Sequence, residues 1–416
     1  MQYTWKKTAL IVAGEVLLAA LLLCIGLLFF SRTFQGYFAW NENNYFAYGW
    51  KSLHYDKMRL LETDRKYDMY INLKMVENPD GSFMVFSHQC HLDSIAYHIS
   101  LIKLDKNLHQ LWEKLVPGYV EPFPVDAGFT GEKYCLITPD YRGDSEKVFI
   151  RTFNPDGSLD KVRELQGDYT GDRCSFQQFI LVGKSAFILS QRTKPQNLVL
   201  AEVDIASGKL IRESTLPLTE KDLIVSQVKY DSQSKAIYFA GTDRSCVDGR
   251  EENRGKRVLV WKYDSSGQLA QIIEQKFPDK VSVALCIDDM PYLVVASIKT
   301  SANDTHSLRV YAIKDNKLAK LWVYEVEGAS QNRMQCIKTG KFWYVSDSYK
   351  RGKESYSAII KFDNAGKYVA RTKLIASRYY WFYQLVQTRE GRILFTGTIN
   401  DLLSPGGRPF VSVVKE

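Results

Sequence analysis

The side chains that could do chemistry gather in polar connecting segments that follow strongly apolar stretches of the chain. Imidazole, carboxylate, guanidinium and phenol groups bind ligands and transfer protons, and they usually act from loops held by a rigid scaffold. We therefore predict that these segments form one binding face; the alternative for each residue is a solvated hairpin tip. The candidates are His88, His91, Asp93, Asp140, Tyr141, Arg142, Arg192, Asp243, Arg244, His306, Asp347, Tyr349 and Lys350.

The spacing His88-x-x-His91-x-Asp93 brings potential metal ligands close together in the sequence. At the end of a strand this spacing defines no coordination geometry, and a third ligand is not evident. The chain also lacks Gly-x-Ser-x-Gly, phosphate-binding-loop and His-Glu-x-x-His motifs. The sequence therefore predicts no metal and no cofactor, and it favours a protein that is not an enzyme.

A repeated unit must position these segments. It consists of an alternating strand, a turn containing Asp, Asn or Gly, and a second alternating strand, and it recurs about every 50 residues. Asp and Gly suit such turns because a hairpin needs positive φ angles and hydrogen bonds from side chain to backbone. The copies are Leu101–Trp112, Ile150–Leu159, Leu200–Leu210, Val260–Leu269, Val310–Leu318 and Ile360–Tyr368.

A further hairpin precedes each copy, and its second strand is strongly apolar. These apolar strands are Phe83–Phe86, Tyr134–Ile137, Ala186–Leu189, Ala236–Phe239, Tyr292–Val295, Phe342–Val345 and Arg392–Phe395. Each complete unit therefore contains four strands.

The last unit ends after its third strand, Phe410–Val414, while Lys57–Thr63 precedes the first unit as an additional strand. If this strand completes the last unit, the ring closes and no sheet edge stays unpaired. We predict an all-β fold over residues 57–416, a seven-bladed β-propeller of four-stranded blades whose N-terminal strand closes the last blade. A pair of β-sandwiches and an open β-solenoid are the alternatives.

The repeat wording Ala201-Glu-Val-Asp204, followed by Gly208-Lys-Leu210, resembles that of the quinoprotein-like (PQQ-type) propellers of bacteria. The resemblance spans residues 57–416 and is architectural. The tryptophan that follows the turn in that family occurs here at Trp112 and Trp322. The resemblance implies a membrane-anchored bacterial propeller, and no bound quinone is predicted.

The N-terminus carries a predicted membrane anchor. Thr8–Phe30 is apolar over 23 residues apart from Glu15, and about 20 apolar residues span a bilayer. Lys6 and Lys7 precede it, which places residues 1–7 in the cytoplasm and the propeller outside it at the cell membrane. Residues 31–56 form an aromatic juxtamembrane segment. The alternative is a cleaved signal peptide.

Glu15 is costly inside a bilayer unless it is paired, protonated or near the interface. Small residues surround it, including Gly14, and small residues allow close contact between helices. Either Glu15 contacts a membrane-protein partner or it is a protonated or snorkelling residue of a lone anchor.

Charge bears on the class of partner, and cysteine content bears on disulfide formation. The net charge of +8 is spread along the chain without a basic block, so nucleic-acid binding is not expected. Outside the anchor the cysteines are even in number, which permits disulfides in an oxidising compartment. Cys286 and Cys336 occupy similar places on the first strands of neighbouring units, so they are candidates for proximity. Burial as small apolar residues is the alternative.

The sequence favours a non-catalytic, extracytoplasmic module that binds a protein or polymer partner. The alternative is a propeller enzyme acting on carbohydrate or peptide linkages. An enzyme should bring three or more ionisable residues into a pocket at the mouth of the central channel. A binding module should instead expose an apolar or aromatic patch on the loops or outer rim; one candidate is Tyr379, Tyr380, Trp381 and Phe382.

Overall fold

The protein was studied as a computed structural model. It describes residues 59–60, 69–90, 97–116, 126–140, 147–165, 174–193, 196–218, 223–243, 245–247, 250–252, 255–298, 305–327, 329–330, 334–351, 354–376, 380–401 and 404–414. All of them belong to one compact unit, Gly49–Glu416. The predicted anchor, including Glu15, and the aromatic segment after it lie outside these residues. No helix among the described residues is long and apolar enough to cross a membrane.

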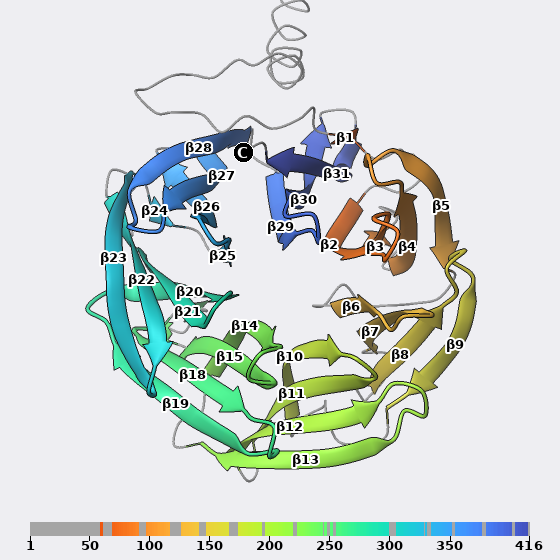
Figure 1. The fold of residues 1–416 in the computed structure, drawn as a ribbon, viewed down its shortest axis with the longest axis horizontal. Helices are drawn as coiled ribbons and strands as arrows, with labels where there is room; N and C mark the ends of the chain where they lie inside the picture. Colours follow the sequence, from red (N-terminus) through yellow and green to blue (C-terminus); the bar gives the residue numbers. More distant parts are fainter. Residues whose placement is uncertain are drawn as a thin grey trace, which may run out of the picture. The chain divides into compact units, whose positions relative to one another are not determined.

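Seven antiparallel sheets form a ring of four-stranded blades, as predicted, with the first-strand position of blade 6 divided between two short strands (Figure 1). Blade 1 contains β2 (Met69–Glu77), β3 (Phe83–Cys90), β4 (Tyr97–Leu104) and β5 (Gln110–Val116). Blade 2 contains β6 (Asp126–Phe129), β7 (Tyr134–Asp140), β8 (Lys147–Phe153) and β9 (Leu159–Glu164). Blade 3 contains β10 (Cys174–Val182), β11 (Ser185–Thr193), β12 (Gln196–Asp204) and β13 (Leu210–Pro217).

Blade 4 contains β14 (Leu223–Asp231), β15 (Ala236–Asp243), β18 (Arg257–Tyr263) and β19 (Leu269–Lys276), with a small hairpin of β16 (Ser245–Val247) and β17 (Arg250–Glu252) inserted. Blade 5 contains β20 (Lys280–Ile287), β21 (Pro291–Ile298), β22 (Thr305–Lys314) and β23 (Lys317–Glu327). In blade 6, β24 (Ala329–Ser330) and β25 (Gln335–Lys338) both pair with β26 (Phe342–Arg351), which β27 (Glu354–Asp363) and β28 (Tyr368–Ala376) follow.

The two ends of the chain share blade 7. It contains β29 (Tyr380–Gln387), β30 (Ile393–Asp401), β31 (Ser404–Val414) and the N-terminal strand β1 (Arg59–Leu60). Arg59 pairs with Val411 and Leu60 with Phe410. The predicted closure is therefore confirmed, and β1 pairs with the edge of β31 at these two positions.

The first strands of the blades line the inside of the ring and contact each other around it. Side chains reach across from blade to blade at this level. Gln384 Oε1 accepts from the Met75 amide at 2.7 Å, and Gln335 Oε1 accepts from the Leu385 amide at 2.7 Å. These bonds satisfy polar groups that would otherwise be buried without partners.

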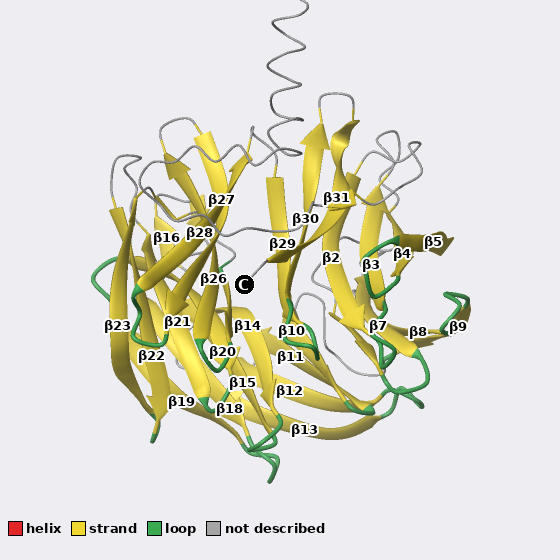
Figure 2. Ribbon diagram, turned by 45° about the horizontal axis from the view of Figure 1, so that its top comes forward, coloured by secondary structure: helices red, strands yellow, loops and turns green. Residues whose placement is uncertain are grey.

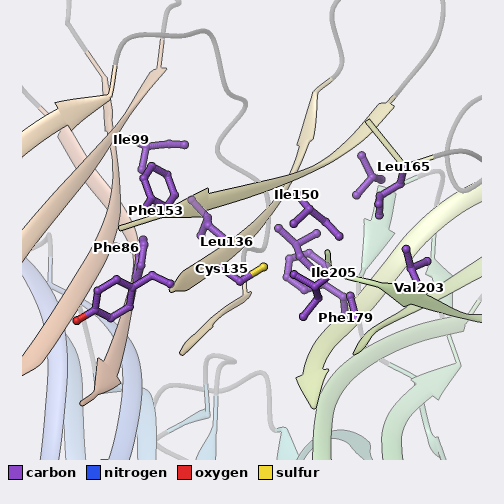
Figure 3. Packing of buried hydrophobic residues seen from close by; sticks show 14 of the residues in the cluster. Phe86, Ile99, Cys135, Leu136, Ile150, Phe153, Leu165, Phe179, Val203 and Ile205 are labelled. Atoms are coloured by element: carbon purple, nitrogen blue, oxygen red, sulfur yellow. The ribbon is translucent and has the colours of Figure 1, made fainter. Parts of the chain in front are cut away.

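The core lies between the faces of neighbouring blades, because each blade is covered on both sides. The second strands are therefore nearly continuous apolar runs; seven of the eight residues of β15 are buried. Figure 3 shows one cluster, in which Phe86, Cys135, Ile150 and Phe179 come from three successive blades. Burial raises the pKa of the Cys135 thiol to about 12, so it behaves as an apolar group.

Most of the described turns, green in Figure 2, join first to second strands or third to fourth strands, and we call this end of the blades the turn face; the described connection 277–279 instead joins β19 to β20. The other connections define the loop face. At the turn face, a side chain of an outermost strand covers the turn glycine of the next blade. Trp112 lies over Gly157 and Trp322 over Gly366, while Arg212 lies over Gly267. Glycine is needed there because its φ is positive and a Cβ atom would overlap the covering side chain.

Candidate functional site

Only some of the predicted loop-face residues are described by the structure. The predicted residues that lie outside the described ranges are His91, Asp93, Tyr141, Arg142 and Arg244. Asp140 belongs to β7, and Tyr349 and Lys350 belong to β26, by their backbones alone. The common binding face therefore stays a prediction.

His306 and Asp347 are brought together at the interface of blades 5 and 6. His306 Nε2 lies 2.7 Å from Asp347 Oδ2, and both side chains are buried. His306 belongs to β22 and Asp347 to β26, so the contact joins two blades. A buried pair of this kind needs its partner, because removing one member leaves the other buried and unpaired. The pair is thus positioned to hold two blades together.

His88, in contrast, is buried between blades 1 and 2 with no hydrogen-bond partner for either ring nitrogen among the described residues. Burial, together with the positive charge of Arg151, lowers the pKa of His88 to about 3. The imidazole is therefore neutral at physiological pH. A cation beside it and its lack of solvent contact make it a poor general base.

Arg192 and Asp243 are engaged within their own blades. Arg192 forms a two-point ion pair with Glu213, with Nη2 to Oε2 at 3.0 Å. Asp243 accepts from the Arg257 amide at 2.8 Å, and Arg257 also donates to Glu274 at 3.1 Å. Among the candidates whose side chains are described, only His306 and Asp347 meet each other.

A hollow of about 260 Å³ lies elsewhere, at the turn face between blades 3 and 4. Its lining mixes aromatic and charged side chains and comprises Val182, Ser185, Phe187, Glu202, Arg212, Tyr230, Lys235, Ile237, Tyr263, Asp264 and Ser265. The ring centroids of Phe187 and Tyr263 lie 5.7 Å apart. Sequence reasoning missed this hollow because its residues come from turns and strand ends of two blades and share no motif.

The charged groups of the hollow are largely held by neighbours. Asp264 accepts from Ser266 and Gln268 within its turn, and these hydrogen bonds lower the pKa of its carboxyl group. Arg212 donates to the Ser266 carbonyl at 3.1 Å and lies 3.9 Å from Glu202. A catalytic acid needs a raised pKa and a free oxygen. The Asp264 carboxylate is suited to fixing the turn.

A different surface feature stands out on the outermost strands. All exposed large apolar side chains among the described residues lie there, on β5, β9, β13 and β23. Those on three consecutive blades, 1 to 3, are termed the apolar rim: Leu111, Leu159, Val162, Leu210 and Ile211. Leu111 is 59% exposed and Ile211 53%. The predicted aromatic patch from Tyr379 to Phe382 lies outside the described side chains.

Within the described ranges, no group of three or more His, Cys, Asp or Glu is placed to hold a metal ion. The structure adds no metal ligands to the candidates named from the sequence.

Comparison with known proteins bears on the fold alone. No protein-family model and no curated protein matches the chain. Among solved structures it is similar to the core factor of S. cerevisiae, with a TM-score of 0.54 and 10% identity over 92% of this chain and 64% of that one. The Dos1 propeller has a TM-score of 0.48 and 11% identity, over 86% of this chain and 96% of that one. The periplasmic gluconolactonase of Pseudomonas aeruginosa has a TM-score of 0.49 and 12% identity, over 73% of this chain and 85% of that one. At these identities the function of these proteins does not transfer to this chain.

Proposed function

We propose that this protein is a non-catalytic binding module whose apolar rim docks a protein partner. The observation that carries the proposal is the concentration of exposed apolar side chains on the outer strands of blades 1 to 3. Single exposed leucines are ordinary on protein surfaces, whereas a series along adjacent blades is typical of an interaction site.

The composition around the rim also supports a protein partner. Leu210 and Ile211 precede Arg212 and Glu213 on β13, and on β9 two charged residues follow each of Leu159 and Val162. Protein interfaces combine apolar anchors with a polar surround. Covering apolar surface contributes roughly 25 cal/mol per Å², so a few anchors of this size give useful affinity.

The rim hypothesis is tested by replacing Leu159 and Leu210 together with Asp in the full-length chain and recovering bound proteins from its own cells. We expect the partner to be lost while the thermal unfolding midpoint stays within a few degrees of the parent. Leu321→Asp with Val323→Asp is the matched control, because these residues are equally exposed but lie on blade 5. Equal recovery by both double variants would refute the proposal.

A second candidate, a site for a polymer unit, rests on the hollow between blades 3 and 4. Aromatic rings beside polar and charged groups suit a sugar or a similar amphipathic unit. An enzyme acting there on carbohydrate or peptide linkages is less well supported, because Asp264 and Arg212 are committed to turn contacts. Titration of oligosaccharides against the parent and the Phe187→Ala variant distinguishes binding in this hollow from binding at the apolar rim.

Membrane attachment through residues 8–30 is part of the proposal, with the propeller on the extracytoplasmic side. The apolar run and the preceding lysines support it. Protease added to intact cells should then remove the propeller, and protection from protease would exclude this orientation. A partner of Glu15 is tested by affinity purification of the parent and Glu15→Ala, which should recover different membrane proteins.

Kinship with the quinoprotein-like repeats is likewise proposed, without a quinone. It is supported by Trp112 and Trp322, which cover the turn glycine of the following blade in the same manner.

A further inference from the structure

Two thiols meet inside the ring, between blades 5 and 6. Cys286 lies on β20 and Cys336 on β25, and these innermost strands contact each other. Both side chains are buried in one cluster, at 2% and 3% exposure. The Cys336 thiol donates a hydrogen bond to the Cys286 sulfur. The proximity anticipated from their places on neighbouring first strands is confirmed.

The surroundings treat the two sulfurs differently. The backbone amide of Lys338 donates to Cys286 Sγ at 3.0 Å, whereas the positive charge of Lys229 acts on both sulfurs. The hydrogen bond from Cys336 and these groups lower the pKa of Cys286. Burial, and the hydrogen bond it donates, raise the pKa of Cys336 well above its usual value. Cys286 is thus the sulfur that accepts an additional hydrogen bond from a backbone amide, and such a bond stabilises a thiolate at this position.

The side chain of Lys338 forms ion pairs with two aspartates of the turn between β20 and β21. Its ammonium lies 2.6 Å from Asp288 and 3.1 Å from Asp289. The strand end that carries the amide donor to Cys286 is thereby anchored on the first turn of blade 5. The donor consequently stays aimed at the sulfur.

Cys135 is the internal comparison. It is buried as deeply as the pair, but burial raises its pKa to about 12, and neither Cys286 nor Cys336 shares its cluster. Burial alone therefore gives an inert thiol in this fold.

We propose that Cys286 and Cys336 form an oxidisable dithiol that closes to a disulfide and covalently joins blades 5 and 6 at the inner ring. The oxidant is a small peroxide, because both sulfurs are too buried for a bulky disulfide. The Cys286 thiolate attacks one peroxide oxygen, the O–O bond breaks, and a sulfenic acid and hydroxide form. The Cys336 sulfur then attacks the sulfenic sulfur, the S–O bond breaks and water leaves with the thiol proton. The hydroxide takes up the proton that Cys286 released on ionising, so two sulfurs are oxidised and both peroxide oxygens end as water.

The bond would lie where other blades are joined by side chain–amide hydrogen bonds, such as Gln335 to Leu385 between blades 6 and 7. A covalent link at this level restricts the unfolded chain and resists separation of the two blades. This inference concerns the ring and is independent of the apolar rim.

The test uses the full-length protein, purified in detergent with reductant, then freed of reductant and treated with hydrogen peroxide. Free thiols are alkylated under denaturing conditions, and the peptides are mapped by mass spectrometry. We expect a Cys286–Cys336 linked peptide, lighter by two hydrogen atoms than the separate pair, which reductant cleaves. The thermal midpoint should rise by several degrees on oxidation.

Cys135→Ser is the control, and it should keep the linked peptide. Cys286→Ser should abolish the link and leave Cys336 open to alkylation. If either variant fails to fold, mapping of the parent protein decides alone. Full alkylation of both cysteines after peroxide treatment, or a Cys286 sulfinic acid without a link, would overturn the proposal.

Discussion

The outermost strands of blades 2 and 3 differ from that of blade 4 at a leucine that all three share. Leu159, Leu210 and Leu269 each stand two residues after the turn glycine and begin the fourth strand. The first two are 43% and 45% exposed, whereas Leu269 is 6% exposed. The repeat thus fixes the residue and its backbone, while its burial depends on the neighbouring blade.

Leu269 is buried because the facing blade supplies a cover. It joins the cluster between blades 3 and 4 that contains Phe187 and Tyr263. Leu159 and Leu210 belong to none of the buried clusters among the described residues. The turn sequence therefore does not determine whether its leucine is covered, and an uncovered copy of a core leucine is a candidate for contact with an external partner.

The largest effect is expected from placing a charge at the covered position. Leu269→Asp buries an unpaired carboxylate, which costs roughly 3–5 kcal/mol of unfolding free energy. Leu210→Asp should change it by less than about 0.5 kcal/mol, because that side chain is solvated. Denaturant unfolding of the two variants measures the difference, and similar losses of unfolding free energy would contradict the difference in burial between Leu269 and Leu210.

A smaller effect is expected from the turn glycine of blade 4. Gly267→Ala forces a side chain into positive φ and displaces Arg212 from the Ser266 carbonyl, at a combined cost of roughly 2 kcal/mol. Gly183→Ala is the control, since Gly183 also has positive φ but no atom lies near its Cβ position; it should cost about 1 kcal/mol. Equal thermal shifts would show that the contact with Arg212 contributes nothing.

The smallest effect concerns acid sensitivity of the turns. Hydrogen bonds from Ser207 and from Ser266 lower the pKa values of Asp204 and Asp264 from the ordinary 3.8. A carboxyl group with a lowered folded pKa stabilises the fold above pH 3.8 and loses that contribution as pH falls through the folded value. Asp204→Asn and Asp264→Asn should both flatten this acid limb slightly, because the turns are alike even though the leucines differ. A clear difference between them, measured by unfolding at pH 3 and pH 6, would contradict a shared turn chemistry.

Much of the fold is predictable from the sequence because it depends on local pattern. Alternation and turn residues locate the strands, and the spare strand within 57–63 predicts β1 and the ring closure. The Cys286–Cys336 contact follows from equal positions in neighbouring units.

The exposure of Leu159 and the hollow beside Phe187 are not predictable in this way, since they depend on how two blades face each other. The burial of His306 against Asp347 has the same origin: two residues distant in sequence meet only when blades 5 and 6 pack. Side-chain type alone therefore does not separate a solvated ligand-binding residue from a buried pair.

The proposed binding function depends most on the uncovered leucines, which should contact the partner. A photo-activated cross-linking residue placed in turn at 159, 210 and 321 of the full-length chain, in its own cells, tests this directly. We expect one discrete cross-linked protein that is shared by positions 159 and 210 and absent at 321. The same cross-links at all three positions, or none at 159 and 210, would contradict it.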